Sequence, residues 1–149
     1  MNNSHEYRVT AIWEGGRRGK VSSEGIGPIE FSTPPEFKGE PGYWTPEHFL
    51  VAAVASCYVA TFYALAELSR MKFLGLELVV EGRLGKPEGK LRFTEILLKP
   101  TLTIAQSQDH EQADRLLVKA EQGCLIARSL VCPMHLEPLV RYAEEILAL

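Results

Sequence analysis

The longest apolar stretch of the chain covers residues 49–68 and has almost no polar face. A helix start precedes it, because Thr45 is a favourable N-cap and Pro46 suits the first helical position. Glu47 then places a negative charge at the positive end of the helix dipole. Since a helix that is apolar on every side is normally buried on every side, the pattern predicts a central core helix with Cys57 near its middle.

This stretch is not expected to span a membrane. A spanning helix needs about 20 predominantly apolar residues and basic flanks that set its orientation. No basic flank supports a span here. Ser56, Thr61 and Glu67 interrupt the apolar run, and Arg70 follows it closely. We therefore expect a core helix of a protein that has no membrane partner.

Short alternating runs predict strands before the helix. Residues 7–13 alternate and are rich in β-formers, and residues 20–23 begin a return strand after the glycine-rich turn at 15–19. Residues 29–32 predict a third short strand. Residues 33–43 contain three prolines and two glycines, which is loop composition.

Two longer β-type runs follow the helix, at residues 76–84 and 91–104. Residues 85–89 between them have hairpin chemistry. We expect one face of the second run to contact the central helix. Pro100 within this run indicates a bulge or an edge position.

A second helix is predicted from a cap at Asp109 to about Glu121, because apolar residues recur there at helical spacing: Ala113, Leu116, Leu117 and Ala120. After Gly123, residues 124–130 predict one or two further helical turns. Residues 134–140 predict a short edge strand, and residues 141–149 a helical or frayed end. The order of strands, helix, strands, helix is typical of an α+β fold.

The 149 residues are enough for one compact domain, which we expect to cover residues 1–149. A net charge of −3 gives no general case for nucleic-acid binding. The first seven residues form a short polar segment with no apolar run before a cleavage site. We therefore expect no signal peptide, and we expect a cytoplasmic location.

Three cysteines are an odd number, which argues against a closed framework of structural disulfides. Cys57 has mostly small helical neighbours, so a second chain or a narrow apolar substrate could approach its sulfur; the alternative is an inert buried thiol. If Gly123 ends the preceding helix, Cys124 begins a new helical turn, where the helix dipole lowers the pKa of a thiol. The alternative is that Cys124 only packs in the core. Cys132 precedes a proline in an extended segment, and packing is its simpler explanation.

Arg17 and Arg18 lie at the glycine-rich turn, where an arginine is usually solvated, and Glu47 is explained by its helix-start position. These charges acquire a functional meaning only in combination. A reactive thiolate needs a nearby cation, and an arginine aimed into a dry site needs an anion to hold it.

Three segments together resemble the OsmC/Ohr family of osmotically inducible and organic hydroperoxide resistance proteins. They are residues 15–23, residues 45–57 with Glu47 and Cys57 ten positions apart, and residues 120–130 around Cys124. They follow the family's order over nearly the whole chain, although Leu125 stands where the family usually has proline. The resemblance implies an α+β fold with antiparallel sheets around a long buried helix. It also implies an intertwined homodimer with two active sites at the subunit interface.

The resemblance further implies a thiol-dependent peroxidase that reduces organic hydroperoxides of alkyl or lipid type. Cys57 is then the peroxidatic nucleophile, Cys124 the resolving thiol, Arg17 the cation that activates the thiolate, and Glu47 the carboxylate that orients it. The preceding glycine pair favours Arg17 over Arg18 for this role. No metal or other cofactor is implied. An external dithiol of lipoyl or thioredoxin-like type restores the thiols.

Helix geometry adds a prediction about Glu47 and Cys57. In an unbroken helix, ten residues span about 15 Å, and the two side chains differ by roughly 80° around the axis. Both side chains of one chain therefore cannot share an arginine directly. Either the helix is broken between them, or Glu47 serves Cys57 of the partner subunit, which we favour.

Two other functions compete with the peroxidase. One is a zinc site of Cys57, Cys124, Cys132 and His135, although the eight-residue gap between Cys124 and Cys132 is unusual and no Cys-x-x-Cys pair exists. The other is a dimeric binding module without catalysis, whose apolar cleft holds a small apolar ligand with the cysteines as lining.

Overall fold

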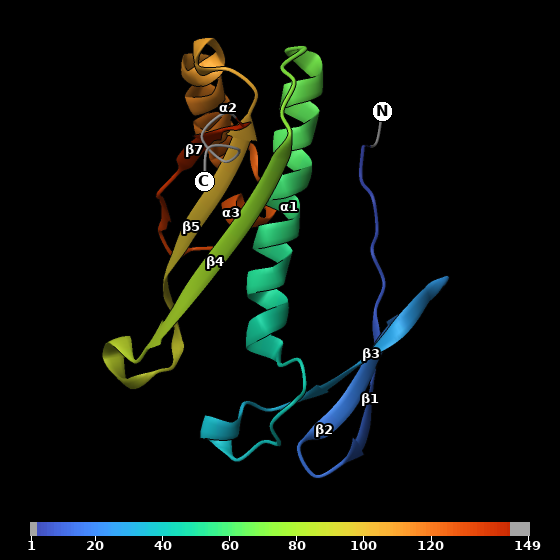
Figure 1. The fold of residues 1–149 in the computed structure, drawn as a ribbon. Coiled ribbons are helices and arrows are strands. Elements are labelled where there is room, and N and C mark those ends of the chain that lie inside the picture. Colours follow the sequence, from blue (N-terminus) through green and yellow to red (C-terminus); the bar gives the residue numbers. More distant parts are fainter. Residues whose placement is uncertain (1–2, 144–149) are drawn as a thin grey trace. The chain divides into compact units, whose positions relative to one another are not determined.

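The structure, a computed structural model, describes residues 3–143 (Figure 1). Within it the chain forms two compact units, one up to Leu50 and one from Val51 onward. The expectation of a single domain over residues 1–149 stays a prediction.

The first unit contains a three-stranded antiparallel sheet in the order β1-β2-β3: β1 (Thr10–Gly15), β2 (Arg18–Ser23) and β3 (Ile26–Ser32). The three strands and the pairing of the first two are as predicted, and β3 pairs with β2. However, β1 begins at Thr10 rather than at residue 7, because Thr10 already pairs with Ser22 near the end of β2. A short 3₁₀ turn, η1 (Pro35–Phe37), lies in the predicted loop.

Helix α1 runs without interruption over Pro46–Leu68. Its start is capped as predicted, since the Thr45 hydroxyl accepts a hydrogen bond of 3.1 Å from the backbone N–H of His48. By length and composition alone α1 would also qualify as a membrane span, a test that core helices of soluble proteins pass as well.

Within residues 3–143, the buried residues of α1 form one stripe, made of Val54, Tyr58, Phe62 and Ala66. Val59 and Tyr63 are 40% and 57% exposed. The prediction that α1 is buried on every side is therefore wrong for a single chain, because the other elements of the chain cover one face only.

The second unit is built on β4 (Gly75–Gly85) and the long β5 (Arg92–Ile104), which pair antiparallel and are joined through the 3₁₀ turn η2 (Pro87–Gly89). Two short strands, β6 (Met134–Leu136) and β7 (Leu139–Tyr142), both pair parallel with β5. The expected antiparallel pairing is present in both sheets, and β6 and β7 add parallel pairs to this one.

The predicted edge strand at 134–140 is thus two strands, separated at Glu137 and Pro138. Pro100 lies in the central strand β5, and the prediction of a bulge or an edge position there is wrong. It stands opposite the gap between β6 and β7, where no ladder N–H is required of it. Residues 141–142 belong to β7 and not to a helix, and residues 144–149 lie outside the described residues.

After β5 come the 3₁₀ turn η3 (Ser107–Asp109), helix α2 (His110–Gly123) and the short helix α3 (Leu125–Arg128). Helix α2 buries the four residues that its periodicity predicted. It packs on α1, where the Tyr58 hydroxyl donates a 2.8 Å hydrogen bond to the carbonyl oxygen of Leu117. Alternate residues of β5 complete the core, namely Ile96, Leu98, Leu102 and Ile104. The α+β fold class is as predicted.

Candidate active site

Cys57 lies near the middle of α1, on the flank of its buried stripe, and its side chain is half-buried. The residues one turn before and after it include Ala53, Ala60 and Thr61, which are small. Its sulfur is 3.9 Å from the hydroxyl oxygen of Thr61. A thiol in this position is partly desolvated but still open on one side.

Cys124 lies at the junction of α2 and α3, where it has extended backbone angles and occupies the N-cap position of α3. The expectation that it begins a new helical turn is confirmed. Its side chain is fully buried, and its sulfur is 3.9 Å from the carbonyl oxygen of Val54, one turn before Cys57 on α1. The junction therefore brings Cys124 to the part of α1 that carries Cys57.

Both thiols are free, and each of them influences the pKa of the other. Although burial acts to raise the pKa of the Cys57 thiol, hydrogen bonds outweigh it, and the pKa is lowered. In order of size, these bonds come from the backbone N–H of Ile126, the Cys124 thiol, the Thr61 hydroxyl and the backbone N–H of Leu125.

The expectation that the helix start lowers the pKa of the Cys124 thiol is wrong, because burial raises this pKa and the neighbouring Cys57 raises it further. The backbone N–H groups of Ala127 and Ile126 offset only part of this effect. Of the two thiols, Cys57 is therefore the one that ionises more readily. This asymmetry suits a nucleophile and a second thiol that reacts later.

Arg17 and Glu47 belong to the first unit, whereas both cysteines belong to the second. Arg17 is exposed and its guanidinium has no ion pair among residues 3–143. Arg18, in contrast, is 3.6 Å from Glu40 and 4.0 Å from Glu30, and its guanidinium lies 4.8 Å from the centre of the Tyr43 ring. Of the two arginines, Arg17 is the one without a partner in its own unit.

Glu47 does not pair with either arginine in the described structure. Its Oε2 atom is buried and has no hydrogen-bond partner within the described chain. Because α1 is unbroken between Glu47 and Cys57, the first of the two alternatives for these residues, a broken helix, is excluded. The unpaired oxygen needs a donor, since a buried carboxylate without one is unfavourable.

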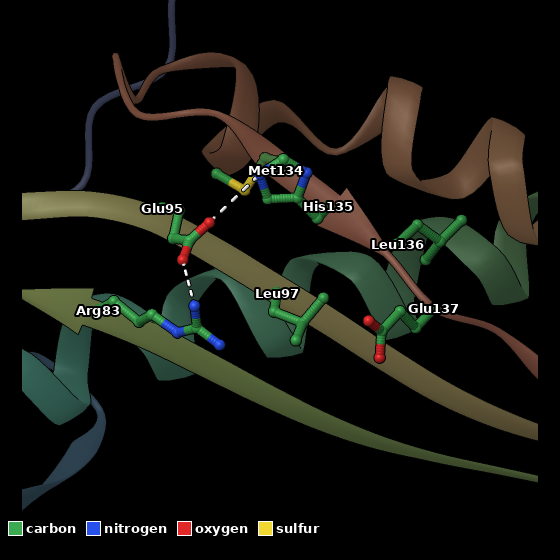
Figure 2. Close-up of a pocket in the computed structure, with 7 residues that line it drawn as sticks. All are labelled: Arg83, Glu95, Leu97, Met134, His135, Leu136 and Glu137. Atoms are coloured by element: carbon green, nitrogen blue, oxygen red, sulfur yellow. Dashed lines mark hydrogen bonds and ion pairs between the residues drawn. The ribbon is translucent and has the colours of Figure 1, made fainter.

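His135, which the zinc hypothesis used, lies in a different place. It lines a cavity of about 530 Å³ on the sheet of the second unit. Figure 2 shows its side chain beside that of Glu95. Its Nε2 is 3.4 Å from Glu95, which also pairs with Arg83. Among residues 3–143, no group of three or more His, Cys, Asp or Glu side chains is arranged to hold a metal ion. Cys132 is half-buried and free.

Sequence reasoning found both cysteines but missed the groups that surround Cys57. In the sequence, Thr61 stands out only as a polar residue within an apolar run. The amides of Leu125 and Ile126 are main-chain groups, which every residue except proline carries, so no sequence signal distinguishes them.

Comparison with known proteins gives the family. The model of OsmC-like proteins matches residues 39–138, a range that includes Glu47, Cys57 and Cys124 but not Arg17. The chain is 30% identical over 132 residues to the uncharacterized protein YmaD of Bacillus subtilis (strain 168), which covers 85% of this chain and 87% of that protein.

Solved structures agree on the fold. An OsmC-like protein of unknown function from Vibrio cholerae O1 biovar eltor str. N16961 matches with a TM-score of 0.84 and 21% identity, covering 91% of this chain and 100% of that chain. An organic hydroperoxide resistance protein from Elizabethkingia anophelis matches with a TM-score of 0.76 and 21% identity, covering 95% and 99%. With its motifs, its fold and the match to the family model in agreement, the chain belongs to the family of OsmC-like proteins.

Proposed function

We propose that this protein is a cysteine-based peroxidase that reduces organic hydroperoxides through Cys57 and Cys124. The family, together with solved structures named for organic hydroperoxide resistance, supports a peroxide-related redox role. The observation that carries the specific proposal is the pairing of two free thiols whose pKa values are shifted in opposite directions, downward for Cys57 and upward for Cys124.

In the first step, the Cys57 thiolate attacks the distal oxygen of the hydroperoxide. The O–O bond breaks, the alcohol leaves after taking up a proton, and Cys57 becomes a sulfenic acid. The sulfur is oxidised by two electrons, and the peroxide is reduced by two. The small side chains around Cys57 favour an alkyl or lipid substrate.

In the second step, the Cys124 sulfur attacks the sulfenic acid of Cys57. A disulfide forms, and the Cys124 proton leaves with the hydroxyl group as water. An external dithiol of lipoyl or thioredoxin-like type then reduces the disulfide by exchange and becomes a disulfide itself. The cycle needs no metal or organic cofactor. We propose that it operates in the cytoplasm.

Arg17 activates the Cys57 thiolate in this proposal, and Glu47 orients the arginine. Two observations support a site shared between two copies of the chain. The unbroken helix keeps Glu47 about 15 Å from its own Cys57 along the axis, and Glu47 Oε2 is buried without a partner among the described residues. The protein is then a homodimer in which Glu47 of one copy serves Cys57 of the other.

The test is consumption of an organic hydroperoxide, with a small dithiol as reductant, by wild type, Cys57→Ser and Cys132→Ser. We expect wild type and Cys132→Ser to consume the peroxide and Cys57→Ser to fall to the background rate. Equal consumption by wild type and Cys57→Ser would refute the peroxidase and favour a binding module without catalysis.

A further inference from the structure

Thr61 is one helical turn after Cys57 on α1, and residues at this spacing lie on the same face of a helix. Its hydroxyl oxygen is 3.9 Å from the Cys57 sulfur, a distance at which sulfur takes part in hydrogen bonds. The two side chains therefore form a contact within one rigid element.

The hydroxyl of Ser56, on the same helix, provides a comparison for the hydroxyl of Thr61. Hydroxyls inside helices usually bond back to a carbonyl three or four residues earlier. Ser56 does so, since its hydroxyl donates to the carbonyl oxygens of Ala52 at 2.8 Å and Ala53 at 3.2 Å. Within residues 3–143, the hydroxyl of Thr61 has Cys57 as its hydrogen-bond partner instead.

The end of α2 leaves space for the Thr61 side chain. A Cβ atom at position 123 would lie only 3.3 Å from the Thr61 Cγ2 atom, so glycine at this position avoids crowding of the methyl group.

We propose that Thr61 stabilises the Cys57 thiolate by donating the hydrogen of its hydroxyl group to the sulfur. In the thiol state either atom can be the donor, but a thiolate can only accept, so ionisation fixes the direction of the bond. The role deepens the proposed function, in which Cys57 is the nucleophile, and rests on it.

The electrostatics of the site agree with this direction. Burial acts to raise the pKa of Cys57, but the pKa is lowered overall, and the Thr61 hydroxyl is one of the groups that lower it. The backbone donors Leu125 and Ile126 belong to the segment that follows Cys124. Thr61 is on the helix of Cys57 itself, so its bond to the sulfur does not depend on the position of that segment.

The test compares Thr61→Val, which keeps the shape but removes the hydroxyl, with Thr61→Ser, which keeps the hydroxyl. Ser56→Ala is the matched control, because it removes a neighbouring hydroxyl that bonds to the backbone. Brief alkylation with iodoacetamide over a range of pH, followed by peptide mass spectrometry, gives the ionisation midpoint of Cys57 separately from the other thiols.

We expect Thr61→Val to raise the midpoint of Cys57 by about one pH unit, which slows its alkylation about tenfold below the midpoint. Thr61→Ser and Ser56→Ala should keep the wild-type midpoint. An unchanged midpoint in Thr61→Val overturns the role of Thr61. If Thr61→Val does not fold, Thr61→Ala is the second variant that lacks the hydroxyl, and the same expectation applies to it.

The readout does not require peroxide turnover, so it separates this inference from the proposed function. A raised midpoint in a protein that consumes no peroxide supports the role of Thr61 while the peroxidase fails. An unchanged midpoint in an active peroxidase overturns the role of Thr61 and leaves the peroxidase standing.

Discussion

Two faces of α1 have similar apolar character but different surroundings. The buried face carries Val54, Tyr58, Phe62 and Ala66, each 1% exposed or less. The exposed face carries Val59, Ala60, Tyr63 and Ala64, which the rest of the chain leaves open. Apolar surface of this kind marks an interaction site in many proteins. The comparison teaches that one apolar face of α1 serves the core of the described chain while the other stays open. In the proposed homodimer, a second copy would cover the open face.

Removal of a large side chain from the buried face should have the largest effect. Phe62 is fully buried and packs edge-on against Phe73, with 5.3 Å between ring centres. We expect Phe62→Ala to lower the free energy of unfolding by about 3–5 kcal/mol, measured by denaturant titration, because a cavity remains.

Phe62→Leu is the matched control and should cost less than about 2 kcal/mol, because most of the apolar volume is kept. If both variants cost the same small amount, the buried face does not form the core that the structure assigns to it.

A charged side chain introduced on the exposed face of α1 should weaken dimerisation. In a two-fold dimer a substitution enters the interface twice, and a buried charge without a partner is strongly unfavourable. We expect Val59→Glu to weaken dimerisation at least about a hundredfold, measured by light scattering during size-exclusion chromatography over a range of concentrations.

Val59→Ile keeps the apolar surface and should remain dimeric. A wild-type protein that is monomeric throughout, or a Val59→Glu variant with unchanged assembly, would show that the exposed face has another occupant or none.

The smallest expected effect is a difference between the alkylation rates of Cys57 and Cys124. Because the pKa of Cys57 is lowered and that of Cys124 is raised, the thiolate fraction of Cys57 exceeds that of Cys124 at any pH below both values. We expect Cys57 to be alkylated at least about tenfold faster than Cys124 at neutral pH, with the difference shrinking as the pH rises through both pKa values. Equal rates at neutral pH would contradict the asymmetry.

Much of the fold followed from periodicity. The four buried residues of α2 could be predicted because apolar side chains recur there at helical spacing in an otherwise polar segment. The N-cap at Thr45 followed from local chemistry. In α1 the apolar residues have no periodic pattern, so the sequence did not distinguish the face that its own chain covers from the face that it leaves open.

The two cysteines of the site could be predicted from the sequence, whereas the groups that surround them could not. Cys57 and Cys124 are far apart in the sequence, and the resemblance to a family suggested their pairing before the structure placed the α2–α3 junction beside α1. The main-chain donors of Leu125 and Ile126 depend on backbone geometry at that junction. The ion pairs of Arg18 with Glu30 and Glu40 could not be predicted either, since they depend on how the strands and the following loop bring these residues together.

The central claim is that Cys57 and Cys124 form one redox pair, and intact mass with disulfide mapping tests it most directly. Reduced protein receives one equivalent of an organic hydroperoxide. The account predicts the loss of two hydrogens and a single Cys57–Cys124 bridge, with Cys132 free. A sulfinic acid at Cys57 without a bridge would keep the nucleophile and remove Cys124 as the resolving thiol. No change at any thiol would contradict the account.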